Sequence, residues 1–216
     1  MFVSTRGAAP AVRLAEALRL GLAPDGGLYV PTEIPRMDPA EWAALRGRSL
    51  PDVATALIAP LVADTFDRDA LARLMASALS FPIPLVPIAP SIFALELFHG
   101  PTLAFKDIGA RSMARWLAAT ADDATGAPLT VLVATSGDTG GAVAHAFHGV
   151  PGTRVVVLYP RGRVSPVQEA QFATLGGNVT AIAVEGTFDD CQRLVKAAFS
   201  DAALAARFRL TSANSI

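Results

Sequence analysis

The chain has 216 residues, of which 52% are hydrophobic and 17% charged, and its formal net charge is −1. This charge gives no electrostatic basis for binding nucleic acid or an anionic membrane surface. No apolar run approaches the ~18 residues that a membrane-spanning helix needs, because prolines such as Pro60 interrupt the longest ones. The N-terminus lacks a basic segment followed by an apolar one, and a single cysteine, Cys191, fits a reducing compartment. We therefore expect a cytoplasmic protein.

The first 80 residues carry mainly helical patterns. Apolar residues from Val12 to Leu20 lie on one helical face and precede Gly21, which predicts a helix that ends at this glycine. The turn-forming residues in 23–30 then lead into a short strand. Further helices are predicted over 39–46, 51–63 and 67–79, the last with Asp67 as its cap. These residues are expected to form a small, mainly helical N-terminal domain.

Residues 81–90 read Phe-Pro-Ile-Pro-Leu-Val-Pro-Ile-Ala-Pro. The prolines force extended backbone and exclude a helix. We interpret this segment as a connector between a domain over 1–80 and a second domain over 91–216.

After the connector, strand and helix patterns alternate. Strands are predicted over 92–98, 129–134, 154–159 and 178–184, and helices over 107–120, 138–148, 166–175 and 187–199. Pro166 opens one of these helices and Thr187 caps another. Nearly continuous apolar strands that alternate with helices are typical of a parallel sheet covered by helices on both faces. The fold class expected for 91–216 is therefore α/β.

Lys106 is one of only two lysines, the other being Lys196. Its neighbours Leu103 to Phe105 are apolar, so we expect its side chain to be partly desolvated, which favours the neutral amine. A neutral amine is what a Schiff base with an aldehyde cofactor requires. Taken alone, however, the residue is better interpreted as a lysine whose stem packs on apolar surface at the start of a helix.

A glycine-rich loop, Thr-Ser-Gly-Asp-Thr-Gly-Gly over 135–141, follows one predicted buried strand and opens a helix. Ligands bind at the carboxyl ends of strands in open α/β sheets, and helix N-terminal amides suit a carboxylate or phosphate. A plain strand-to-helix turn is the alternative. The loop lacks the lysine of a P-loop, and Thr139 stands where a chymotrypsin-like nucleophile loop needs serine.

Together, the lysine segment and this loop resemble the fold-type II pyridoxal-phosphate enzymes, and among them the threonine synthase family. The matching segments are 3–7, 21–31, 95–107, 133–140, 159–171, 185–192 and 210–216, which together span essentially the whole chain. The resemblance implies the family's N-terminal domain over 1–80 and part of its catalytic domain over 91–216. It also implies pyridoxal 5′-phosphate as cofactor, bound to Lys106, which would also move protons on the substrate.

The implied reaction converts O-phosphohomoserine and water into threonine and phosphate, which is carbon–oxygen lyase chemistry. The implied substrate-binding residues are Thr135, Ser136, Gly137, Thr139, Asn214 and Ser215. Asp138 stands where many relatives carry an asparagine that faces the cofactor's phenolic oxygen, so an acid there needs a proton or a neighbouring cation. His99 and Thr102 are candidates for shaping the cofactor pocket, although a structural hydrogen bond is favoured for His99.

His145 and His148 are spaced i and i+3 on a predicted helix, but no companion ligands accompany them, so no metal is expected. Members of the family continue well beyond this length. Their second half supplies a glycine-rich loop for the cofactor's 5′-phosphate and a Ser or Thr opposite the pyridine nitrogen. Neither is evident after Lys106, so we expect a truncated chain with little turnover by itself. The alternatives are another pyridoxal-phosphate lyase of the same fold and a non-catalytic remnant; no oligomeric state is predicted.

Overall fold

The computed structural model describes residues 1–121 and 126–213, and the chain divides into two compact units, Met1–Ser80 and Phe81–Ile216. The elements of the first unit are β1 (Phe2–Ser4), α1 (Leu14–Leu20), β2 (Tyr29–Pro31), α2 (Pro39–Ala44), α3 (Leu50–Val62) and α4 (Arg68–Ala78). Strands β1 and β2 pair antiparallel. None of the described helices is long and apolar enough to cross a membrane.

Local side-chain chemistry sets the helix ends of the first unit. Asp38, Ser49 and Asp67 each accept a hydrogen bond from a backbone N–H in the first turn of α2, α3 and α4. Helix α1 ends at Gly21, whose φ of 71° suits glycine. The predicted cap at Asp67 and the predicted helix end at Gly21 are therefore confirmed.

The carboxylate of Asp25 links the turn near residue 25 to residues 4–9. It accepts hydrogen bonds from the Ser4 hydroxyl at 2.7 Å and from the backbone N–H groups of Ala8 and Ala9, both at 3.0 Å. The hydrogen bonds from Ser4 and from the backbone of Gly27 lower the pKa of Asp25. The turn that the sequence predicts near residue 25 is thus fixed by one ionised side chain.

The second unit is built on a four-stranded parallel sheet with the order β7-β6-β5-β8. Its strands are β5 (Leu129–Ala134), β6 (Thr153–Pro160), β7 (Val179–Val184) and β8 (Arg209–Ser212). Its helices are α5 (Asp107–Ala119), α6 (Asp138–Phe147), α7 (Pro166–Ala173), α8 (Phe188–Ser200) and α9 (Ala202–Arg207). The predicted α/β class and parallel sheet are confirmed, but β8 and α9 were not predicted.

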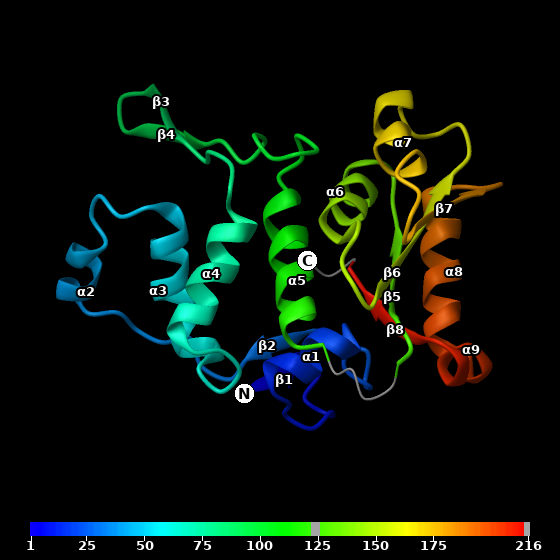
Figure 1. The fold of residues 1–216 in the computed structure, drawn as a ribbon, viewed down its shortest axis with the longest axis horizontal. Helices are drawn as coiled ribbons and strands as arrows, with labels where there is room; N and C mark the ends of the chain where they lie inside the picture. Colours follow the sequence, from blue (N-terminus) through cyan, green and yellow to red (C-terminus); the bar gives the residue numbers. More distant parts are fainter. Residues whose placement is uncertain (122–125, 214–216) are drawn as a thin grey trace. The chain divides into compact units, whose positions relative to one another are not determined.

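Helices cover both faces of the sheet, with α8 on one side and α6 on the other (Figure 1). Cys191 and Val195 of α8 pack against Leu132, Ala134 and Leu158 in a buried cluster. Strand residues of the opposite parity, including Val131 and Val157, are fully buried as well. Apolar side chains on both faces explain why these strands read as continuous hydrophobic runs.

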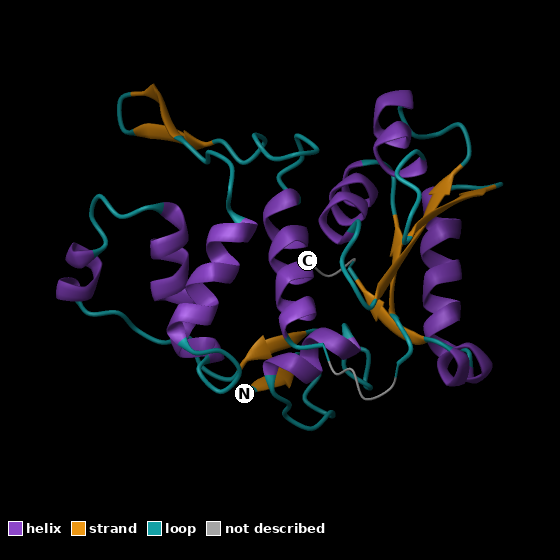
Figure 2. Ribbon diagram, in the orientation of Figure 1, coloured by secondary structure: helices purple, strands orange, loops and turns teal. Residues whose placement is uncertain are grey.

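One expected strand does not belong to this sheet. Ile92–Leu95 forms β4, which pairs antiparallel with β3 (Leu85–Ala89) as a separate two-stranded hairpin (Figure 2). The prolines do hold the segment extended, but the predicted connector contains a strand, and the predicted strand over 92–98 is wrong in its extent and its partner. A tight turn, in which Ser91 has a φ of 62°, brings the two strands together. Large apolar residues of the hairpin, Phe93 among them, are exposed.

Candidate active site

The candidate site lies where the sheet order reverses. From β5 the chain runs through α6 to β6 on one side, whereas β8 pairs with the opposite edge of β5. The connections of an α/β sheet diverge at such a point and leave a crevice outside the carboxyl ends of the strands, where ligands bind. The loop over 135–141 leaves β5 at this place and opens α6.

Thr135 organises the glycine loop from within. Its side chain is 1% exposed, and its hydroxyl oxygen accepts the backbone N–H of Gly137 at 2.9 Å and that of Gly140 at 2.8 Å. Ser136, which follows, is exposed, and Thr139 is half-buried in the first turn of α6. Ser136 is therefore open to solvent next to a helix N-terminus, while Thr135 holds the shape of the loop. Their roles toward substrate stay predictions.

Lys106 lies immediately before α5, at the end of a turn over 100–107 that we call the lysine turn. The turn is fixed by Asp107, a carboxylate that is 1% exposed and accepts two hydrogen bonds from Thr102. The Thr102 backbone N–H donates at 2.9 Å and its hydroxyl at 2.8 Å. Thr102 thus braces the lysine turn through Asp107.

The amine of Lys106 faces the glycine loop. Its Nζ lies 3.7 Å from Oδ2 of Asp138 and 4.2 Å from the ring centroid of Phe105. The Lys106 side chain is 29% exposed, so it is partly desolvated as expected. Leu103 and Phe105 are themselves 72% and 57% exposed, however, so the apolar flank of the lysine is open to solvent in this chain.

Leu103 has a φ of 61°, in the left-handed region that a bulky side chain rarely adopts. Such conformations cost free energy and cluster at functional sites. The lysine turn thus combines a strained backbone, a buried acid and a half-buried amine within a few residues. Such a combination is typical of a functional site in which the surrounding structure maintains a strained backbone conformation.

The other candidate residues are placed as follows. Nε2 of His99 lies 2.7 Å from Oε2 of Glu96, within hydrogen-bonding distance, which is the structural partnership favoured by the sequence. Asn214 and Ser215 lie outside the described residues. Within 1–121 and 126–213, no three His, Cys, Asp or Glu side chains gather as metal ligands. The predicted helix over 138–148 ends at Phe147, so His148 lies just beyond it, where it is exposed.

Two residues that the sequence did not single out also touch the site. Gln171 of α7 donates from Nε2 to the backbone oxygen of Thr102 at 3.1 Å. Gln168, one helical turn earlier, donates to the carboxylate of Asp138. Their spacing of three residues places both side chains on one face of the helix, which the sequence does show. Nothing in the sequence indicates which loops this face contacts.

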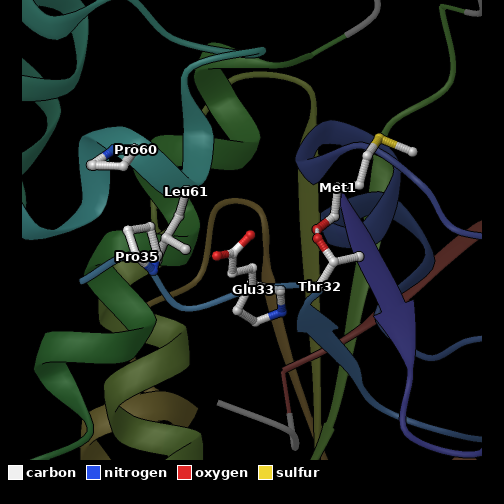
Figure 3. Close-up of a pocket in the computed structure, with 7 residues that line it drawn as sticks. Met1, Thr32, Glu33, Pro35, Pro60 and Leu61 are labelled. Carbon is white, nitrogen blue, oxygen red and sulfur yellow. Dashed lines mark hydrogen bonds between the residues drawn. The ribbon is translucent and has the colours of Figure 1, made fainter.

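A separate pocket of about 310 Å³ lies in the first unit (Figure 3). The residues that line it are Met1, Pro31, Thr32, Glu33, Pro35, Pro60 and Leu61. It contains none of the residues to which the sequence assigns chemistry, and Glu33 is the only acidic side chain in its lining. The lysine turn and the glycine loop, to which the sequence assigns the chemistry, lie in the second unit.

The fold agrees with comparisons to known proteins. Residues 80–212 match the family model described as pyridoxal-phosphate dependent enzyme, and residues 1–79 match the model for the threonine synthase N terminus. The chain belongs to the pyridoxal-phosphate dependent enzyme family. This membership confirms the predicted family and the predicted cofactor class.

Within that class, the similar proteins are threonine synthases. Those of Serratia marcescens and Escherichia coli (strain K12) are each 44% identical over 205 residues, which cover 95% of this chain and 47% of theirs. The crystal structure of pyridoxal-phosphate-bound threonine synthase from Brucella melitensis has a TM-score of 0.90 at 43% identity, covering 100% of this chain and 47% of that one. The Escherichia coli structure gives 0.89 at 41% identity, covering 99% and 49%. The chain spans about half the length of the curated relatives it matches.

Proposed function

We propose that this chain forms the lysine-bearing part of an enzyme that converts O-phosphohomoserine and water into threonine and phosphate. The observation that carries the proposal is the amine of Lys106 held 3.7 Å from the Asp138 carboxylate of the glycine loop. This arrangement stands in a chain 44% identical to threonine synthases over 205 residues. The reaction is a carbon–oxygen lyase reaction in which phosphate leaves and water adds.

The residues present fit the aldehyde end of pyridoxal phosphate. Lys106 offers a half-buried primary amine, and the adjacent lysine turn is braced by Asp107, so the amine is presented from a fixed backbone. When bound, the cofactor supplies an aldehyde for this amine and a ring that stores the electron pair of a carbanion. The Lys106 amine is also placed to move protons at the substrate carbons beside it.

The glycine loop fits the anionic groups of the substrate. Peptide N–H groups at the N-terminus of α6 carry partial positive charge and suit a carboxylate or phosphate. The exposed hydroxyl of Ser136 and the half-buried hydroxyl of Thr139 add side-chain donors at the same helix end. Thr135, whose oxygen accepts two backbone N–H groups, keeps these donors oriented.

Asp138 of the glycine loop lies beside the Lys106 amine. Its side chain is 50% exposed, and the Lys106 amine lies next to one of its oxygens. We therefore assign Asp138 the role of holding the lysine side chain toward the glycine loop until the cofactor binds.

The presence of only two lysines makes the cofactor role directly testable. Purified chain is incubated with pyridoxal phosphate, reduced with borohydride, and digested for mass spectrometry. The adduct should form at Lys106 far more than at Lys196, which is exposed on α8. Lys106→Arg should abolish it, whereas the matched variant Lys196→Arg should leave it unchanged. Equal labelling of both lysines would contradict the assignment.

The reaction itself is tested in a chimera that joins this chain to the second half of the Escherichia coli threonine synthase. O-phosphohomoserine should yield threonine and phosphate in equal amounts, and Lys106→Ala should abolish both products. Phosphate release without threonine would show a different lyase of the same family. The isolated chain is expected to have little turnover, so steady threonine formation without the added half would also contradict our reasoning.

A further inference from the structure

Helix α7 carries two glutamines, Gln168 and Gln171, three residues apart. Residues with this spacing lie on the same face of a helix. Each of them reaches a different segment of the candidate site, one the lysine turn and the other the glycine loop. The face of α7 that carries them therefore borders both halves of the site.

Gln171 binds the lysine turn and packs on α6. Its Nε2 donates to the backbone oxygen of Thr102, the residue whose N–H and hydroxyl brace Asp107 next to Lys106. A Cβ added at Gly141 would lie 2.6 Å from Oε1 of Gln171, so only glycine at this position lets the side chain approach. The amide of Gln171 thus spans from α6 to the lysine turn.

Gln168 holds the glycine loop in the same way. It donates from Nε2 to Asp138, while its Oε1 accepts the hydroxyl of Ser165, the N-cap of α7, at 3.0 Å. A Cβ at Gly137 would lie 2.5 Å from Oε1 of Gln168, and the φ of 147° at Gly137 also favours glycine. Hydrogen bonds therefore orient both the nitrogen and the oxygen of the Gln168 amide, which packs against the backbone of Gly137.

We propose that Gln168 and Gln171 are positioning residues that hold the lysine turn and the glycine loop against each other, and so fix Lys106 relative to Asp138. Neither glutamine needs to contact the cofactor or substrate, since Gln171 acts through Thr102 of the lysine turn and Gln168 through Asp138 of the glycine loop. The catalytic meaning of this clamp rests on the proposed function, but its existence is a property of the cofactor-free chain and is tested there.

The first test follows the Lys106 amine directly. Reductive methylation with ¹³C-formaldehyde labels both lysines and the N-terminus. Lys106→Arg and Lys196→Arg assign the two lysine signals. The Lys106 signal should be displaced from that of Lys196 because its amine lies 4.2 Å from the Phe105 ring centroid, whereas Lys196 is exposed. Gln171→Met, which keeps the side-chain length and removes the donor, should move the Lys106 signal toward that of Lys196.

Gln168→Met gives the sharper result. The hydrogen bonds of Gln168 lie on Asp138 and Ser165, so a purely local role would leave the lysine turn unaffected. If the clamp exists, releasing Asp138 should also move the Lys106 signal. Gln192→Met on α8 is the matched control and should leave it in place.

Hydrogen exchange supplies the second readout. Loss of one hydrogen bond should speed amide exchange about fivefold in the segment it holds. That segment is the lysine turn, 100–107, for Gln171→Met and the glycine loop, 135–141, for Gln168→Met. Circular dichroism checks that the variants are folded. Unchanged exchange in both segments, together with a Lys106 signal that neither variant moves, would overturn the clamp. Neither readout needs cofactor or substrate, so failure of the clamp is distinguished from failure of the proposed function.

Discussion

Replacing Thr135 by valine tests whether the glycine loop is held together by one buried hydroxyl. The substitution keeps the branched shape but removes the oxygen that accepts the N–H groups of Gly137 and Gly140. A buried donor left without its acceptor costs about 1–3 kcal/mol. Two such donors should cost about 2–4 kcal/mol once the loop relaxes, which is a large part of the ~5–15 kcal/mol that stabilises a domain.

Thr130 provides a control on the adjoining strand. It is 5% exposed on β5, and its hydroxyl has no hydrogen-bond partner among the described residues. Thr130→Val removes a buried polar group that satisfies nothing, so it should be neutral or stabilise by up to about 1 kcal/mol. The same chemical change is therefore expected to have opposite consequences at two buried threonines.

The two tryptophans allow the second unit to be followed alone. Trp42 lies in α2 and Trp116 in α5, so a Trp42→Phe background leaves a fluorophore only in the unit of interest. In urea, Thr135→Val should lower the unfolding midpoint by about 1–2 M at an unchanged slope. A midpoint equal to that of the parent protein, or an equal loss in Thr130→Val, would refute the reasoning.

Two further predictions concern α8. Hydrogen bonds from the Thr187 backbone and from Arg193 lower the pKa of Asp190 from 3.8 to about 2. The contribution of the ionised Asp190 cap to the free energy of unfolding should be complete above pH 3.8 and be lost as the pH falls toward 2. The difference in unfolding free energy between the protein and its Asp190→Asn variant should therefore shrink over that interval. The pKa of the Cys191 thiol is raised, mainly by burial and also by the negative charge of Asp190. Because the thiol is fully buried and protonated, iodoacetamide at neutral pH should alkylate it only after urea unfolds the chain. Rapid alkylation of the native protein would show that α8 opens readily.

The parallel sheet was predictable because its strands are apolar on both faces and alternate with capped helices. Local chemistry at Gly21, Asp67, Pro166 and Thr187 places the helix ends where the sequence predicts them. The β3–β4 hairpin was not predictable in the same way. Its residues are equally apolar, and only pairing with the neighbouring segment, rather than with β5, distinguishes it from a sheet strand.

The candidate site likewise contains residues that the sequence could identify and residues that it could not. Lys106 and the glycine loop could be found because the residues that indicate their chemistry are adjacent in the sequence. The two glutamines could not, because each acts on a segment distant in sequence, as from Gln171 to Thr102. Asp107 reads as an ordinary acid in the first turn of a helix, and only the structure shows that it is buried and bound by Thr102.

The position of β8 has a consequence for the order in which the second unit assembles. Strands β5, β6 and β7 follow one another along the chain, each joined to the next by a single helix. β8 pairs with β5 only after all of them have been synthesised. Contacts between distant segments form late because long loops must close first. The glycine loop should therefore acquire its shape on the ribosome before β8 adds the other border of the crevice.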